Sequence, residues 1–437
     1  MTEQQKYKKG TYHLVTFLIS KLMGSLGGSI YAFGMSMFIL SMTGSALSFA
    51  TNMLLSILPR TVLAPFAGVI IDRVPRKLLV VGGQLGIVLT ISALLTYSFV
   101  FDLSVTAIYA ATFFMNIFAT FSGGAISASV MNLIDEGRLQ KAMSFNQMAY
   151  SMSGIGGPVV GGLLFGFTTM EIFIVIYLIS QIIALILEST MDFNLYKKPV
   201  EKKSAEKQSM MESFKEGLAY IKTKPLLMAL LGSTFALNFF FTALSIGGDF
   251  TLLTLLHLAP EQIGITEAAL AVGLIVASIY FASAKQVKNP LLLSKNSILG
   301  MSMLVMLMAL PLFLSMSTTG NFIYYIVLMF VFGVMNVMTN MPIGVLFQKS
   351  IDDEYKGRVF SILETISMSL MPLATIIYGF LFDVLPAEML FILSGLCLIV
   401  ATLYTLRPSI INIAMADYQN ADETSNDQIE GLAVSKS

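Results

Sequence analysis

The sequence predicts an all-α membrane protein, with twelve transmembrane helices in two pseudo-symmetric six-helix bundles. Of the 437 residues, 56% are hydrophobic and only 12% are charged, against about 25% charged in an ordinary soluble chain. Uncharged apolar stretches of about 20 residues, the length of a membrane-crossing helix, recur along the chain. The charged residues gather mainly in short clusters between these stretches.

The apolar stretches define the expected helices in chain order. The first six span residues 13–40, 46–71, 78–100, 103–133, 142–167 and 169–190, and the second six span 226–249, 266–284, 291–316, 321–346, 358–383 and 387–406. Spanning strands are excluded because each stretch is too long and lacks the alternation over about ten residues of a barrel strand. The chain then divides into a bundle (1–190), a charged linker (191–224), a second bundle (225–407) and a disordered acidic tail (408–437). Within the linker we expect a helix from Met210 to Thr223.

Orientation follows from the basic residues, because short cytoplasmic loops hold lysine and arginine and external loops do not. With the amino terminus inside, 24 of the 26 basic residues fall on the cytoplasmic side and none is external. The other two, Lys21 and Arg60, lie inside expected helices. The first apolar run is too long for a signal peptide. We therefore expect a multi-pass protein of a bacterial cytoplasmic membrane with both termini in the cytoplasm.

Composition disfavours several other classes of protein. The chain has one cysteine, Cys397, and two histidines, His13 and His257, so neither a disulfide framework nor a metal cluster is indicated. The net charge is zero, which gives no general attraction to nucleic acid. No phosphate-binding loop ending in Gly-Lys-Ser/Thr is present, so ATP is not expected as an energy source. We expect no cofactor and no metal.

The two halves carry a weak internal echo at an offset of 217 residues. Asp135, Glu136, Lys141 and Ser144 in the first half correspond to Asp352, Asp353, Arg358 and Ser361 in the second. Duplicated bundles with a central pathway are the architecture of many carriers. A short acidic-then-basic loop can also arise by chance.

Two motifs resemble those of a known family. The loop after the second expected helix contains Gly68, Asp72, Arg73, Pro75, Arg76 and Lys77, and the fifth expected helix contains Gly154, Gly157, Pro158, Gly161 and Gly162. They resemble motif A and motif C of the major facilitator superfamily, the latter associated with antiporters. Further marks at 43–45, 213–218 and 357–359 resemble the bacterial macrolide-efflux and siderophore-export branch. Motif A usually has glycine where this chain has Pro75, and the loop 284–290 lacks an Asp-Arg pair, which implies a one-sided latch.

The resemblance implies that the second and eleventh helices adjoin, so Asp72 would lie near the helix start at Gly357 and Arg358. A carboxylate beside a helix amino terminus is stabilised by up to about 2 kcal/mol, which would lock the cytoplasmic side shut. Arg73, Arg76 and Lys77 either hold the loop against acids or lipid headgroups or only follow the positive-inside rule.

The glycines of the fifth helix lie on overlapping helical faces, which lets a neighbouring backbone approach closely. Pro158 frees the carbonyl four residues earlier. This helix is expected to pack tightly against the helix 266–284. Ordinary helix packing without a role in transport explains the same spacing.

Charges inside a membrane are costly and indicate function. Arg60 lies about 18 Å from the inner end of its helix and Glu364 about 9 Å from the start of its own, at 1.5 Å per residue. We expect Arg60 to line a watery crevice between the bundles and Glu364 to approach Arg60 or Lys21, so that protonation of Glu364 biases the gate; Lys21 can also snorkel. Asp249 is a second carboxylate candidate or a solvated boundary charge, and Glu188 is expected to face water.

Asn116, Asn238 and Asn336 either bind substrate or form helix-to-helix hydrogen bonds worth about 0.6 kcal/mol each. The 29 methionines suit a promiscuous apolar surface. Together these features favour a monomeric secondary transporter in the lipid bilayer that exports an amphipathic small molecule in exchange for protons. Uptake and lipid flipping are the alternatives within this class. A membrane-embedded enzyme or sensor is the alternative of another class, although neither histidine has catalytic neighbours.

Overall fold

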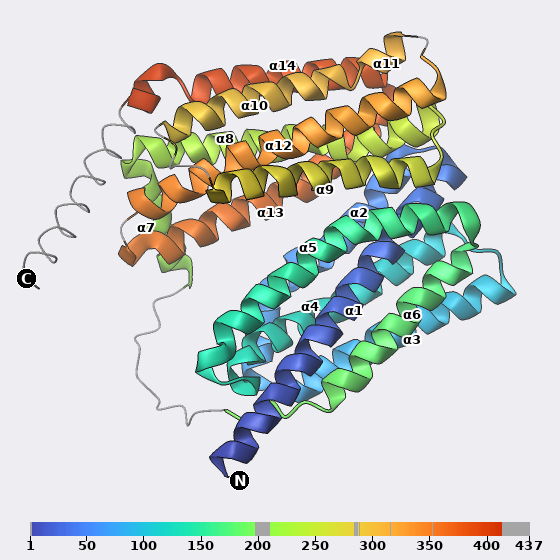
Figure 1. The fold of residues 1–437 in the computed structure, drawn as a ribbon, viewed down its shortest axis with the longest axis vertical. Coiled ribbons are helices and arrows are strands. Elements are labelled where there is room, and N and C mark those ends of the chain that lie inside the picture. The colour runs from blue at the N-terminus through green and yellow to red at the C-terminus, as the bar shows by residue number, and fades with distance from the viewer. Residues whose placement is uncertain are drawn as a thin grey trace, which may run out of the picture. The chain divides into compact units, whose positions relative to one another are not determined.

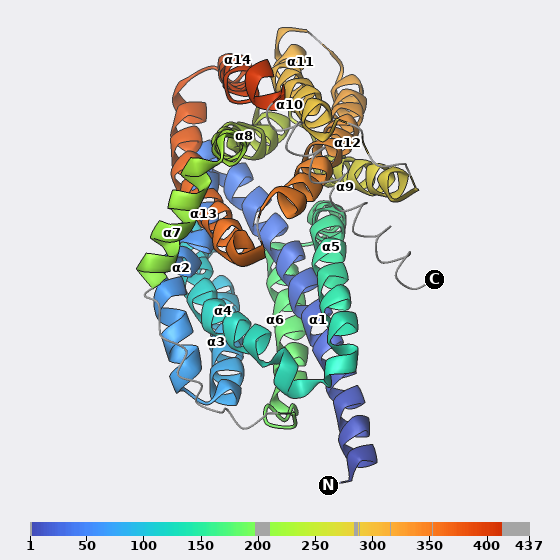
Figure 2. The same cartoon turned by 90° about the vertical axis from the view of Figure 1, so that its left-hand side faces the viewer.

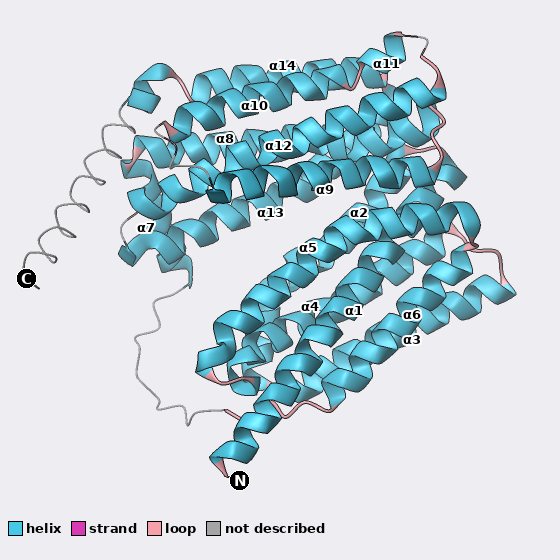
Figure 3. Cartoon of the chain, viewed as in Figure 1, coloured by secondary structure: helices cyan, strands magenta, loops and turns pink. Residues whose placement is uncertain are grey.

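The computed structural model describes residues 2–196, 210–283, 287, 289–314, 316–351 and 353–412. Within these ranges the chain consists of helices joined by loops and turns, without strands (Figure 3). The predicted all-α fold class is confirmed. The helices form two compact units, Met1–Lys203 with Asp249–Ala268, and Ser204–Gly248 with Ala269–Ser437.

The first unit contains six long helices (Figure 1). They are α1 (Glu3–Thr43), α2 (Ala46–Arg73), α3 (Arg76–Val100), α4 (Val105–Leu133), α5 (Glu136–Phe167) and α6 (Met170–Ser189). The unit also includes the end of α8 (Pro225–Phe250), a π-helical turn η1 (Thr251–Leu255) and the start of α9 (Pro260–Ser283).

The second unit contains most of α8 and α9 and the remaining helices. These are α7 (Met210–Thr223), α10 (Pro290–Leu307), α11 (Leu310–Phe313), α12 (Thr318–Ser350), α13 (Asp353–Val384) and α14 (Ala387–Thr405). The helix expected in the linker is confirmed at its stated bounds. Residues 408–412 are helical where the sequence suggested disorder, because Ile411 packs against the apolar core of this unit.

Among the described residues, eleven helices are long and apolar enough to cross a membrane, and the apolar part of α13, Leu370–Val384, is shorter. With α13 as the twelfth, the long helices follow the order that the sequence predicts. One expected helix is interrupted, since residues 291–316 form the two helices α10 and α11. Pro311 cannot donate to the carbonyl of Leu307, and the Tyr324 hydroxyl donates to that oxygen instead, at 2.8 Å.

Helix ends in the first unit follow ordinary capping chemistry. Thr2 and Gln5 form a capping box at the start of α1. At the end of α1, Gly44 adopts a left-handed conformation with φ of 60°, which glycine tolerates without strain. Ser45 then caps α2 by accepting a hydrogen bond from the Ser48 amide at 3.1 Å. The chain therefore turns sharply between two long helices.

Helix α1 lies between α5 and α6 (Figure 2). It runs antiparallel to α6, so Gly34 of α1 packs on the ring of Phe173, and Gly27 packs on Ser180. The small residues let the two helices approach closely. This seam between α1 and α6 positions much of the chemistry described below.

Candidate functional site

A buried carboxylate lies on the seam between α1 and α6. The Glu188 side chain on α6 is only 5% exposed, so the expectation that it faces water is wrong. Lys21 on α1, half-buried, is the cation whose charge acts on Glu188, and the Ser20 hydroxyl also interacts with the carboxyl. The Glu188 Oε2 atom has no hydrogen-bond partner. Sequence analysis considered Arg60 and Lys21 as partners for Glu364 and did not consider Glu188 as a partner of Lys21.

Residues 190–196, here called the strap, follow directly after this end of α6. Met191 and Phe193 of the strap are 0% and 4% exposed and pack in the apolar core. The Tyr12 hydroxyl donates to Thr190 Oγ1 at 2.9 Å, and the Asp192 amide donates to His13 Nε2 at 3.3 Å. The strap is thus fastened to the first turns of α1.

An ion pair also holds the strap. Lys9 Nζ lies 2.7 Å from Asp192 Oδ2, and this hydrogen bond lowers the pKa of the Asp192 carboxyl below its usual range. A lowered pKa gives stability that is present above the unfolded pKa, about 3.9, and is lost as the pH falls through the folded value. Because both side chains are partly exposed, at 42% and 39%, solvent limits the contribution to about 0.2–1 kcal/mol.

Lys9→Met is therefore expected to lower the thermal unfolding midpoint slightly at neutral pH, and the difference from the unaltered protein should vanish in strong acid. Unfolding of the detergent-solubilised chain at both pH values measures this. Lys8→Met is the matched control, because Lys8 is exposed and has no ion pair in the described part of the chain. An equal loss in both variants at neutral pH would contradict the assignment.

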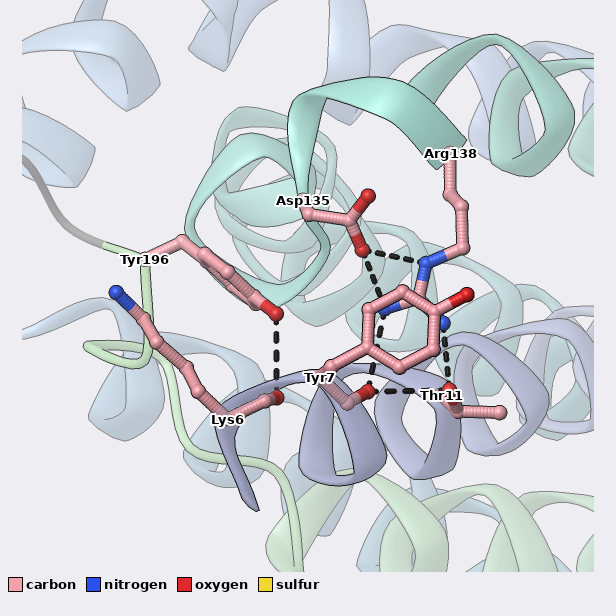
Figure 4. A network of polar contacts seen from close by, with 6 residues as sticks. All are labelled: Lys6, Tyr7, Thr11, Asp135, Arg138 and Tyr196. Atoms are coloured by element: carbon pink, nitrogen blue, oxygen red, sulfur yellow. Dashed lines mark hydrogen bonds and ion pairs between the residues drawn. The ribbon is translucent and has the colours of Figure 1, made fainter. Parts of the chain in front are cut away.

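A polar network joins the loop between α4 and α5 to the start of α1 (Figure 4). Arg138 pairs with Asp135, donates to the Tyr7 carbonyl at 3.3 Å and lies 4.1 Å from the centre of the Tyr7 ring. It also donates to Thr11 Oγ1 at 2.5 Å. The Tyr196 hydroxyl of the strap donates to the Lys6 carbonyl at 3.1 Å. We call this end of the unit, with Lys6, Lys9 and Arg138, the basic end.

Further along the seam, uncharged polar groups connect three helices. Gln84 on α3 donates to the Gln181 carbonyl on α6 at 3.2 Å and also to the Gln181 side chain. Gln181 donates to the Gly24 carbonyl on α1 at 3.4 Å. The rings of Tyr31 and Tyr177 stack with their centres 4.7 Å apart. The two glutamines thus satisfy each other within the unit, whereas the Tyr31 hydroxyl is buried without a hydrogen-bond partner.

A pair of carboxylates lies where the chain passes from α8 to α9. Asp249 and Glu267 are both half-buried, and the charge of Glu267 acts on Asp249. Asp249 lies two residues before the π-helical turn η1, a feature frequent at functional sites, and Thr251 Oγ1 in that turn is buried without a hydrogen-bond partner. Asp249 is therefore not an isolated, fully solvated boundary charge. Glu267 was missed by sequence analysis.

Arg60 on α2 has an exposed side chain and makes no hydrogen bond or ion pair within the described ranges. The side chains of Asp72 and Glu364 lie outside the described residues, as does that of Arg358. The expected crevice around Arg60, its approach to Glu364 and the latch at Asp72 stay predictions. The helix start near Gly357 is corrected: α13 begins at Asp353, about one turn earlier, because the acidic pair Asp353-Glu354 suits a helix amino terminus.

The loop between α2 and α3 is shaped by Pro75, which immediately precedes the first residue of α3. Arg76 donates to the Ala128 carbonyl of α4 at 2.6 Å, so a backbone carbonyl is one of its partners. Arg73 and Lys77 are exposed, and a side chain added at Gly68 would meet no atom within 4 Å. Arg76 therefore fixes the loop to α4, whereas the other two bases are free of this contact.

The three asparagines use their side-chain amides within their own helices. Asn116 donates to the Thr112 carbonyl at 2.8 Å, and Asn238 donates to the Thr234 carbonyl at 2.9 Å. Asn336 Oδ1 accepts from Asn340 at 3.1 Å. Helix-to-helix bonding through these amides is not seen among the described contacts. Their role in substrate binding stays a prediction.

The glycines of α5 divide into crowded and open positions. A Cβ added at Gly162 would come within 2.8 Å of the Pro260 carbonyl and 3.0 Å of the Gly264 backbone, and one at Gly264 within 2.5 Å of the Pro158 carbonyl. Gly157 packs on Ser29. A Cβ added at Gly161 would lie 2.9 Å from the Phe33 ring. At Gly154 nothing lies within 4 Å. The expected close packing of α5 on the helix now called α9 is found at its start, residues 260–264.

One face of α5 forms an open hollow of about 440 Å³. Its lining residues are Gly137, Gln140, Lys141, Ser144, Phe145 and Met148. The Lys141 ammonium lies 5.9 Å from the centre of the Phe145 ring. Cationic, hydroxyl and apolar groups thus share one surface. Across the described residues, no three His, Cys, Asp or Glu side chains are grouped to hold a metal ion.

Comparison with known proteins agrees with this architecture. Residues 17–375 match the sequence model of the Major Facilitator Superfamily. Macrolide efflux protein A of Streptococcus pyogenes is 26% identical over 340 residues, covering 77% of this chain and 80% of that protein. Its namesake in Enterococcus faecalis is 27% identical over 314 residues, covering 71% and 93%.

Solved structures of low sequence identity share the fold. An inward-facing bacterial homologue of the iron transporter ferroportin gives a TM-score of 0.68 at 15% identity, covering 92% of this chain and 98% of that one. A POT family transporter in complex with a thioalcohol-conjugated peptide gives 0.67 at 13% identity, covering 91% and 96%. The predicted resemblance is confirmed. The chain belongs to the Major Facilitator Superfamily and is a multi-pass membrane transporter, not an enzyme.

Proposed function

We propose that this transporter exports an amphipathic organic compound, macrolide-like or siderophore-like, in exchange for protons by alternating access. The observation that carries the direction of transport and the class of compound is the similarity to Macrolide efflux protein A over 77% of the chain. The hollow on α5, where Lys141 lies beside Phe145 and Met148, suits a compound that combines apolar area with polar groups. The protein acts as a monomer.

The basic end faces the cytoplasm of a bacterial cell, and both chain termini lie on that side. The support is the positive-inside rule, since Lys6, Lys9 and Arg138 lie together at one end of the first unit. In this orientation Glu188 lies near the cytoplasmic side. Asp249, at the far end of α8 from Pro225, lies near the outside.

Proton coupling resides at Asp249 and Glu267. Two carboxylates that interact away from water cannot both ionise without a large cost, so such a pair retains one proton. Release of that proton toward the cytoplasm leaves a charged pair that the site tolerates only in another conformation, which ties the proton to the gate. One charge crossing 100 mV supplies about 2.3 kcal/mol, enough for roughly a 40-fold concentration ratio.

The cytoplasmic gate follows the superfamily resemblance. Asp72 at the end of α2 latches onto the first turns of α13, which contain Gly357 and Arg358, and Arg76 keeps the loop in place through the Ala128 carbonyl. A carboxylate at a helix amino terminus contributes up to about 2 kcal/mol. Arg60 and Glu364 form the pair that responds to the gate, and Asn116, Asn238 and Asn336 contact the substrate.

The proposal is tested with everted membrane vesicles that contain the full-length protein and a radiolabelled macrolide. Accumulation inside the vesicles, driven by an acidic interior and abolished by a protonophore, is expected. Accumulation that ignores the pH gradient would contradict proton coupling. Accumulation only in right-side-out vesicles would indicate uptake, and transfer of a labelled lipid without macrolide transport would indicate lipid flipping.

A further inference from the structure

We infer that Glu188 and Lys21 form a second proton-binding site, inside the amino-terminal bundle and separate from Asp249 and Glu267. Glu188 carries a proton in the described structure, and when it loses this proton it pairs with the Lys21 ammonium. The inference rests on the proposed proton exchange for its role in transport. The protonation itself stands on the geometry of the site.

The hydrogen bonds around Glu188 fit a neutral carboxylic acid. Ser20 Oγ donates to the Phe17 carbonyl at 3.1 Å, so its single proton is in use and its oxygen is left to accept a proton from the carboxyl. Oε2 of Glu188 is buried without a partner. An ionised carboxylate with an unpartnered oxygen is much more costly to bury than a neutral acid. The site as described therefore holds the proton.

Lys21 supplies the alternative partner. It makes no hydrogen bond in the described part of the chain, although an ammonium can donate three. Its charge acts on Glu188 from the next position after Ser20 on α1. A small rearrangement that brings the Lys21 ammonium to Oε2 gives a charge-assisted hydrogen bond in place of the proton. In this step the O–H bond of the Glu188 carboxyl breaks and its proton is transferred to water.

The other polar and charged groups near the site do not compete with Lys21 for the Glu188 carboxyl. On α1, His13 lies toward the basic end and faces Asp192 of the strap, which is itself paired with Lys9. On α3, the group that faces α6 is the uncharged Gln84. Met191 and Phe193 of the strap, which follows Glu188 directly, are buried in the apolar core. Proton exchange with the cytoplasm therefore requires the strap or the α1–α6 seam to open.

Protonation is tested directly by infrared difference spectroscopy on the purified full-length protein in lipid. The unaltered protein should show a carboxylic C=O band that disappears as the pH is raised, and Glu188→Gln should lack that band. Glu171→Gln, at the other end of α6, is the matched control and should retain it. Lys21→Met should keep the band to a more alkaline pH, because the ionised carboxylate has lost its partner, and Lys21→Arg should restore the original titration.

Transport is tested by counting protons per substrate in proteoliposomes with a pH-sensitive dye. Glu188→Gln and Lys21→Met should each exchange one proton fewer per substrate than the unaltered protein, and Lys21→Arg should not. Identical carboxylic C=O titrations in the unaltered protein and in Glu188→Gln, or an unchanged proton count, would overturn the inference while leaving the proposed antiport intact. If the unaltered protein shows no pH-driven export, the proposed function fails, and the infrared titration still decides the protonation of Glu188.

Discussion

Asp249→Asn and Glu267→Gln are each expected to reduce pH-driven export strongly while leaving the protein folded. In both variants one carboxyl becomes a neutral amide of similar size, so the repulsion that makes the pair share a proton disappears. The remaining acid then titrates without a partner charge, and its proton no longer depends on the conformation of the gate. The accumulation of a labelled macrolide in everted vesicles should fall far below that of the unaltered protein, and only the part driven by the proton at Glu188 should remain.

The variants should still move substrate down its own gradient, because the pathway and the helices are unchanged. Asp102→Asn is the matched control. It removes an acid that is exposed in the loop between α3 and α4, and export should remain at the unaltered rate. Full pH-driven export in both Asp249→Asn and Glu267→Gln would place the coupling elsewhere, with Glu364 as the first alternative to replace.

The helices were predictable because the membrane fixes their length and composition. An apolar run of about 20 residues has few other stable forms in lipid, and the turn at Gly44 and Ser45 is a local signal that reads directly as a helix end. The break between α10 and α11 was missed because residues 303–314, which contain it, are all apolar. Only Pro311 marks the break in the sequence. The carbonyl of Leu307 that Pro311 leaves free is paired by the hydroxyl of Tyr324, a residue of the next long helix.

The buried acids were harder to predict because their environment is tertiary. Glu188 lies one residue before the end of α6, a position that normally reaches water, yet it is only 5% exposed, and the strap that follows it packs in the apolar core. A signal was present: Gln181 and Glu188 are seven residues apart on an otherwise apolar helix, so they share a face. Glu267 lies within the second turn of α9, and its proximity to Asp249 depends on how the chain returns through η1.

Gly162→Val is expected to cause the largest loss among packing variants. A Cβ at this position would lie 2.8 Å from the Pro260 carbonyl and 3.0 Å from the Gly264 Cα, so it would meet backbone rather than a movable side chain. Overpacking costs about 1–3 kcal/mol, and here helix α5 would have to move away from the start of α9. Both the thermal unfolding midpoint and the export rate should fall.

The same helix provides the control, since Gly154→Val makes the identical change where nothing lies within 4 Å. Both variants gain the same β-branched residue in α5, so any effect of helix propensity is shared and their difference reports the contact with α9. Gly154→Val should keep the unfolding midpoint and export near the unaltered values. Equal unfolding midpoints and export rates in the two variants would mean that the spacing of small residues in α5 serves no close contact. A large loss of export in Gly162→Val with little change in its unfolding midpoint would show that the α5–α9 contact is itself remade during transport.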